Sequence, residues 1–263
     1  MNSREKKMVE TLLELKEKYH VVGIKAEFEA EGTRLEEAMR LKEISLKSGL
    51  KLNLKIGGCE AMKDMFDARN IGIQGIIAPM IESAYALKKY IYAVKNVFLE
   101  EAEDIQIMIN LETITAIDNF DKMLALPEIK NLNGIVFGRV DLSGSLDLDR
   151  DLINHPKILA LALEVAAKAK AKGLKVIVGG GISFESLPFL QAFPQEHLDY
   201  FETRKVIFSC PGALQNPQEA FVKAIEFELL WLNNKKKYYE AISREDEKRL
   251  TMLENRYSLL NYS

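Results

Sequence analysis

Short apolar runs alternate with longer amphipathic segments along most of the chain. The short runs have the length and composition of β-strands, and the longer segments repeat their apolar residues at helical spacing. Strands separated by connections of helix length are typical of βα units in a parallel sheet. Gly49, Gly72 and Gly173 are placed to end three of the helices. Seven strands are predicted at residues 20–29, 50–57, 74–80, 104–112, 132–140, 174–182 and 200–208, with helices at 34–47, 62–70, 83–98, 157–172 and 184–193.

Several of these strands carry polar residues at alternate positions, although buried parallel strands are usually apolar throughout. In residues 104–112, Ile107 and Ile109 share one face, while Asn110 and Glu112 share the other. If the apolar faces pack on surrounding helices, the polar faces point into a closed barrel. We therefore predict an α/β fold, a TIM-type (β/α)8 barrel with extra N- and C-terminal helices, in which one strand is unaccounted for. A sheet with one solvent-exposed face is the alternative.

The pattern changes after residue 210, which divides the chain into a barrel with an N-terminal helix (1–210) and a C-terminal helical extension (211–263). In the extension, residues 216–234 predict a helix that begins at Asn216 and Pro217, and a second helix is predicted from about Ser243. The extension has more apolar surface than a helical hairpin covers. It packs either on the barrel or on another subunit. We expect a homo-oligomer whose contact is centred on Ile225, Leu229, Trp231 and Leu232.

Composition narrows the possible partners. The chain has 263 residues, 48% hydrophobic and 29% charged, with a net charge of −3, so it offers no broad basic field for nucleic acid. No segment has the apolar length of a membrane span, and the N-terminal residues lack the apolar core of a signal peptide. Cys59 and Cys210 have no metal-ligand spacing and are expected to be thiols. A cytoplasmic location, with no membrane or nucleic-acid partner, is predicted.

Two carboxylates follow consecutive predicted strands. Glu112 closes the run INLE, and Asp141 follows the apolar residues of GIVFGRVDL. In barrels the reactive groups lie at the carboxyl ends of strands, so these two side chains are expected to meet there. Two hard oxygen ligands, with room for water and substrate oxygens, suit Mg²⁺ or Mn²⁺. The alternative is that Asp141 caps the following turn and Glu112 caps a helix.

Other charged residues are expected at the same end of the barrel. Glu27, Lys55 and Arg204 are the candidate catalytic side chains, with Lys55 and Arg204 suited to holding two anionic groups of one substrate. The alternatives are structural ion pairs, which would join Lys55 to Glu27 and Arg204 to Glu202. Both interpretations stay open from the residues alone.

A glycine run in VIVGGGIS ends a predicted strand. Backbone amides of Gly180 and Gly181 are therefore candidates for binding a carboxylate or phosphate group of the substrate. A tight turn from strand to helix explains the same glycines equally well.

Three segments are distinctive: LKIGGCEAMKDMFDARNIGIQGIIAPMIES, INLETITAIDNFDKML and NGIVFGRVDLSGSL. With these segments, the chain resembles the HpcH/HpaI aldolase and citrate lyase beta-subunit family from about residue 20 to 210. The resemblance implies a TIM-type barrel in which Glu112 and Asp141 hold Mg²⁺ or Mn²⁺, and a 2-oxo acid such as pyruvate chelates the ion. It also implies that the backbone of Gly138, Arg139 and Val140 faces the substrate carboxylate.

The chain departs from the aldolase branch of that family at two places. The stretches IKAEFEAEG and NLKIGG lack the family's catalytic histidine and its pyruvate-binding arginine, and Lys55 stands where that arginine is expected. His20, His155 and His197 are not placed to replace the histidine. Proton transfer would then fall to Glu27, Lys55 or a metal-bound water.

These observations predict a metal-dependent carbon–carbon lyase, an aldolase acting on a small anionic 2-oxo acid through an enolate. A lyase of the citrate-lyase type, or one acting on a phosphoenolpyruvate-type bond, is an alternative within enzymes. A barrel that binds a ligand without catalysis is the alternative from another class.

Overall fold

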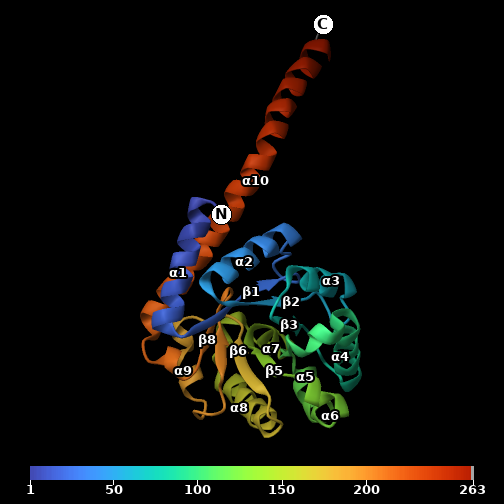
Figure 1. The fold of residues 1–263 in the computed structure, drawn as a ribbon, viewed down its shortest axis with the longest axis vertical. Coiled ribbons are helices and arrows are strands. Elements are labelled where there is room, and N and C mark those ends of the chain that lie inside the picture. The colour runs from blue at the N-terminus through green and yellow to red at the C-terminus, as the bar shows by residue number, and fades with distance from the viewer. Residues whose placement is uncertain (262–263) are drawn as a thin grey trace.

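The computed structural model describes residues 1–261 as a closed barrel of eight strands, in the order β1 to β8, surrounded by helices (Figure 1). This confirms the predicted fold class. The strands are β1 (Val21–Glu27), β2 (Lys51–Lys55), β3 (Gly75–Ala78), β4 (Gln106–Leu111), β5 (Gly134–Gly138), β6 (Lys175–Gly179), β7 (Tyr200–Glu202) and β8 (Val206–Ser209).

The five predicted connecting helices agree with the observed segments to within a few residues, whereas three short helices were not predicted. Short 3-10 turns, labelled η, supplement them. The α-helices are α1 (Ser3–Tyr19), α2 (Leu35–Ser48), α3 (Met62–Ile71), α4 (Ala84–Phe98), α5 (Ile114–Asp118), α6 (Phe120–Leu124), α7 (Arg139–Ser145), α8 (Pro156–Ala171), α9 (Leu187–Gln191) and α10 (Pro217–Asn261). The 3-10 turns are η1 (Leu99–Glu103), η2 (Pro127–Asn131), η3 (Arg150–Leu152), η4 (Phe184–Ser186) and η5 (Gly212–Leu214).

The eighth strand was hidden inside the seventh predicted run. Residues 200–208 form two strands, β7 and β8, which pair antiparallel with Phe201 opposite Phe208. Strand β8 also pairs antiparallel with β1, where Ile24 lies opposite Val206. The other pairs, from β1–β2 through β6–β7, are parallel. A hairpin therefore closes the barrel, in place of a last βα unit.

Arg204 lies in the turn of this hairpin and not on a strand, which corrects the predicted placement. The turn is closed by Thr203, whose N–H donates to the Val206 carbonyl over 2.9 Å and whose hydroxyl accepts from the Val206 N–H over 3.2 Å. Because the turn joins two barrel strands, it still holds the Arg204 side chain at the barrel end.

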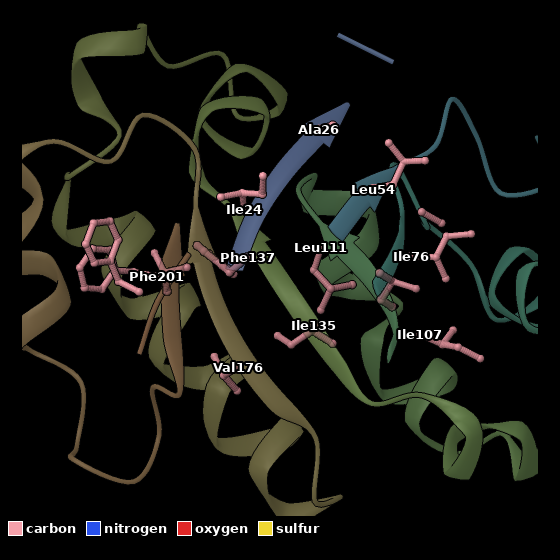
Figure 2. Close-up of a cluster of buried hydrophobic side chains, with 14 of the residues drawn as sticks. Ile24, Ala26, Leu54, Ile76, Ile107, Leu111, Ile135, Phe137, Val176 and Phe201 are labelled. Carbon is pink, nitrogen blue, oxygen red and sulfur yellow. The ribbon is translucent and has the colours of Figure 1, made fainter. Parts of the chain in front are cut away.

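Alternate residues of the strands face two separate apolar regions. The outward face, which includes Ile107, Leu111 and Ile135, packs against the surrounding helices in one continuous core (Figure 2). The inward face forms a small apolar cluster inside the barrel, above which the polar residues begin. This arrangement confirms the alternation that residues 104–112 predicted. The inner cluster consists of Ile77, Met108, Val136 and Ile177, with Tyr200 packed against it.

Helix α10 is a single helix of 45 residues that projects beyond the barrel (Figure 1). The prediction of a second helix from about Ser243 was wrong, because no proline or glycine interrupts residues 218–261. Its first half packs along α1, and Trp231 is buried there, so Trp231 does not belong to an exposed subunit contact. Among the described residues, no helix has the length and apolar character needed to cross a bilayer.

Candidate functional site

A cavity of about 720 Å³ lies at the carboxyl ends of the barrel strands. It brings together nearly all of the residues that the sequence pointed to. Arg139 is the exception: it is fully buried beside the cavity. The predicted site residues that line the cavity are Glu27, Lys55, Glu112, Gly138, Val140, Asp141, Gly180, Gly181 and Arg204.

Glu112 directly follows β4 and is 1% exposed. Its Oε1 accepts a hydrogen bond from the Met80 N–H over 3.0 Å, and its Oε2 accepts one from the Asn110 side chain over 2.7 Å. Met80 has a φ of 50°, a backbone conformation that costs energy for a residue with a side chain. The strained backbone at Met80, after β3, thus directs its N–H toward the Glu112 carboxylate and helps to fix that side chain.

Burial raises the pKa of Glu112, and the nearby charge of Asp141 raises it further, although Lys55 and the two hydrogen bonds oppose the shift. The carboxylate also needs Gly138, since a Cβ there would lie 2.7 Å from the Glu112 Cβ. Glu112 is not a helix cap, because Thr113 caps α5 through its hydroxyl. The alternative interpretation of Glu112 is therefore wrong.

Asp141 lies in the first turn of α7, with an exposed side chain on the same cavity. Within residues 1–261 its carboxylate accepts no hydrogen bond and forms no ion pair, so it does not cap the turn. No group of three or more potential metal ligands of the His, Cys, Asp or Glu type occurs in this range. Two carboxylates with space between them nevertheless fit a Mg²⁺-type ion, which usually takes one or two and keeps several waters.

Three charged side chains fill the centre of the barrel beneath the cavity. Lys25 Nζ lies 2.6 Å from Glu202 Oε1 and 3.0 Å from Glu27 Oε1, and all three side chains are buried. Burial alone would raise the pKa of Glu27, but Lys25, Lys55 and Arg204 together lower it. Glu27 is therefore ionised at neutral pH.

Lys55 and Arg204 are also paired, but with other partners than the sequence suggested. Lys55 Nζ lies 2.8 Å from Glu29 Oε2 and 3.6 Å from Glu112 Oε2, and it forms no ion pair with Glu27. Burial would lower the pKa of Lys55, yet Glu112, Glu29 and Glu27 raise it.

Arg204 forms no pair with Glu202, which is bonded to Lys25. Its Nη1 lies 3.3 Å from Glu27 Oε2 and its Nε 3.6 Å from Glu31 Oε1, with the side chain half exposed. The acidic partners of Arg204 thus come from β1 and the loop after it, whereas those of Lys55 come from that loop and from Glu112 after β4.

The glycine run forms a loop against the start of α7. Gly180 and Gly181 have φ angles of 78° and 64°, which favour glycine. A Cβ on Gly180 would lie 2.7 Å from the Arg139 nitrogen and 2.8 Å from the Val140 nitrogen. The glycine therefore allows the loop to pack directly against these two backbone nitrogens.

Two residues of the site, Asn110 and Lys25, were not among the predicted site residues. Asn110 and Lys25 became site residues through their contacts with Glu112 and Glu27, and the alternation that placed them inward was the available signal. Among the described residues, no histidine lines the cavity. His155, for example, caps α8, where its Nδ1 accepts from the Lys157 N–H.

A closed barrel whose carboxylates, cations and glycine loop open on one cavity at the strand ends has the architecture of a barrel enzyme. Residues 51–179 match the model of the HpcH/HpaI aldolase/citrate lyase family, which confirms the resemblance seen in the motifs. Members of this family are aldolases and lyases. The matched segment contains Glu112 and Asp141, whereas Glu27 and Arg204 lie outside it.

Solved structures share the fold at low sequence identity. An HpcH/HpaI aldolase from Desulfitobacterium hafniense is 17% identical, with a TM-score of 0.60 over 86% of this chain and 90% of that chain. A citrate lyase from Burkholderia xenovorans is 15% identical, with a TM-score of 0.59 over 82% and 73%. Macrophomate synthase is 13% identical, with a TM-score of 0.54 over 90% and 91%. No curated protein sequence matches the chain.

Proposed function

We propose that this chain is a divalent-metal-dependent carbon–carbon lyase, an aldolase that acts on a 2-oxo acid. The observation that carries the proposal is the pair Glu112 and Asp141, which open on one cavity at the ends of neighbouring strands. These carboxylates would hold Mg²⁺ or Mn²⁺. The bound cation would supply positive charge for the enolate oxygen of the substrate.

The charge of the cavity supports this proposal. Within residues 1–261, seven carboxylates line it against four cationic side chains, so an anionic substrate would meet net negative charge. A divalent cation would offset part of that charge at the point where the 2-oxo acid has to bind. The carboxylates belong to Glu27, Glu29, Glu112, Asp141, Glu185, Glu202 and Glu228, and the cations to Lys25, Lys55, Arg150 and Arg204.

Two side chains take chemical roles in this proposal. Lys55 stays cationic, because its pKa is raised, and its ammonium group neutralises the substrate carboxylate. Glu27 is ionised and accepts a proton at its carboxylate oxygen, since no histidine faces the cavity. From its position in the β7–β8 turn, Arg204 binds a distal anionic group of the substrate.

Backbone groups complete the proposed substrate site. Gly138, Arg139 and Val140 would present their backbone to the substrate carboxylate, and the amides of Gly180 and Gly181 would bind an anionic group beside it. Gly138, Val140, Gly180 and Gly181 line the cavity, which supports this assignment, whereas Arg139 is fully buried beside it.

A turnover screen tests the function. Hydroxylated 2-oxo acids are incubated with the protein and Mg²⁺ or Mn²⁺, and released pyruvate is measured. We expect release that depends on the metal and stops with a chelator. Metal binding without pyruvate release from any 2-oxo acid adduct would indicate a barrel that binds ligands without catalysis.

The same proposal includes a homo-oligomer in the cytoplasm. Ile225, Leu229 and Leu232 are each about half exposed on α10, which supports a subunit contact there. Cys59 and Cys210 are free thiols, as a reducing compartment favours. Sedimentation of the native chain and of an Ile225→Lys, Leu229→Lys variant tests the contact, and a native monomer would contradict it.

A further inference from the structure

Arg139 is a buried cation without an acidic partner. Its side chain is 0% exposed, and a guanidinium keeps its charge at neutral pH. Within residues 1–261 no carboxylate pairs with it, and its donors meet only neutral oxygens and the ring of Phe189, 4.9 Å away. An unpaired buried charge is costly, so a purely structural role is a poor explanation.

The guanidinium holds two consecutive carbonyls of the glycine loop. Its Nε donates to the Gly179 carbonyl over 3.2 Å, and its Nη2 donates to the Gly180 carbonyl over 2.8 Å. In a trans peptide the C=O and the following N–H point in opposite directions. The N–H groups of Gly180 and Gly181 are therefore directed away from Arg139.

Those two amides have no partner inside the protein. Gly180 and Gly181 line the cavity, and within the described range their N–H groups donate no hydrogen bond. A polar backbone group next to a cavity needs a ligand or water to satisfy it. Both amides also lie close to the positive charge of Arg139, which strengthens their attraction for an anion.

We propose that Arg139 is a positioning residue, which fixes the carbonyls of Gly179 and Gly180 so that the next two amides bind an oxyanion in the cavity. If the proposed lyase function holds, the bound group is an anionic group of the substrate. The orientation of the amides does not depend on that function.

The chain offers a matched set of variants. Arg139→Met and Arg139→Gln remove both carbonyl contacts, and Arg139→Lys keeps the charge. Asn154→Ala is the control, because it removes another partner of Arg139 Nη1 but leaves both carbonyl bonds in place. If the methionine variant does not fold, the glutamine variant gives the same comparison.

The amides can be observed directly by NMR. Glycine labelled with ¹³C at the carbonyl and ¹⁵N at the amide selects the three Gly–Gly bonds of the chain, two of which report on Gly180 and Gly181. Pyruvate and inorganic phosphate are titrated separately. We expect both amide signals to shift with saturation in the native protein, with an affinity about tenfold weaker in Arg139→Met. Asn154→Ala should stay near native, and Arg139→Lys should recover part of the loss.

Two further readouts separate positioning from general damage. The affinity for Mn²⁺ should be unchanged in Arg139→Met, and in an active enzyme KM should rise more than kcat falls. The proposal is overturned if neither anion shifts the two amides, if Arg139→Met keeps native anion affinity, or if its Mn²⁺ affinity falls equally. Anion binding that depends on Arg139, in a protein that releases no pyruvate, would refute the lyase function and leave this inference standing.

Discussion

The two halves of the barrel mouth differ in how their polar groups are satisfied. At the ends of β1 and β2 and in the β7–β8 turn, Lys25, Lys55 and Arg204 each lie between two carboxylates. At the ends of β5 and β6, the Asp141 carboxylate and the Gly180 amide have no partner within residues 1–261. Charged groups that pair with each other stabilise the fold, whereas polar groups on a cavity that have no partner in the protein are available to bind a ligand.

Removing either carboxylate of the proposed metal site should have the largest effect, although Asp141 is unpaired within residues 1–261 and Glu112 lies beside Lys55. Glu112→Gln and Asp141→Asn keep side-chain volume but take one hard anionic ligand from the proposed site. We expect each to abolish Mg²⁺ or Mn²⁺ binding in calorimetric titration, without loss of fold by circular dichroism. Glu185→Gln, on the same cavity but bonded to Ser183, is the control and should bind metal normally. Unchanged affinity in both test variants would mean that these carboxylates are not ligands.

Breaking the satisfied half should reduce stability. Lys25→Met leaves Glu27 and Glu202 buried without their shared cation, a change that typically costs about 3–5 kcal/mol. Urea unfolding measures the loss. The control is Lys63→Met, which removes an exposed pair with Asp67 and should leave unfolding unchanged. Equal stability of the two variants would show that the central ion pairs contribute little.

Lys55 and Arg204 test whether the paired half also serves the substrate. Lys55→Met and Arg204→Met should each lower kcat/KM by ~2–4 kcal/mol equivalent, the range for a buried charged contact, with metal affinity kept. Arg204 is half exposed, so its effect should be the smaller of the two. Steady-state kinetics on the substrate found by the pyruvate screen decides this. If both variants lose stability but keep full turnover, Lys55 and Arg204 act only as structural ion-pair partners of residues such as Glu29 and Glu31.

The sequence predicted the barrel because strand-end residues and alternation are local properties. Glu112 and Asp141 were found at the cavity from their positions after two apolar runs. The β7–β8 hairpin was not predicted, because Thr203, Arg204 and Lys205 include none of the usual turn residues. Periodicity does not reveal a reversal of chain direction.

Ion-pair partners were the least predictable part of the site. Arg204 donates to Glu27, which is 177 positions away in the chain, and Arg139 donates to the Gly179 carbonyl, which is 40 positions away. Such contacts depend on how the barrel closes, and no local pattern encodes them.

The smallest expected effect concerns stability and pH in the metal-free protein, and its sign differs between Glu112 and Glu27. The pKa of Glu112 is raised, so its stabilising contribution is complete below the ordinary value of 4.5 and is lost as pH rises through the folded value. The pKa of Glu27 is lowered, so its contribution is present above 4.5 and is lost as pH falls through the folded value.

At neutral pH, Glu112→Gln should therefore melt above the native protein and Glu27→Gln below it, by a few degrees, as a change on the order of 1 kcal/mol gives in a chain of this size. The gain in Glu112→Gln should shrink as the pH is lowered toward 4.5, because the native carboxyl then becomes neutral. The deficit in Glu27→Gln should persist to 4.5 and shrink below it. Thermal melts in the presence of a chelator measure both. A stabilised Glu112→Gln that no longer binds metal would mean that the barrel keeps this carboxylate at a cost to its own stability. A destabilised one would mean that the contacts of Glu112 with Met80, Asn110 and Lys55 outweigh the cost of burying its charge.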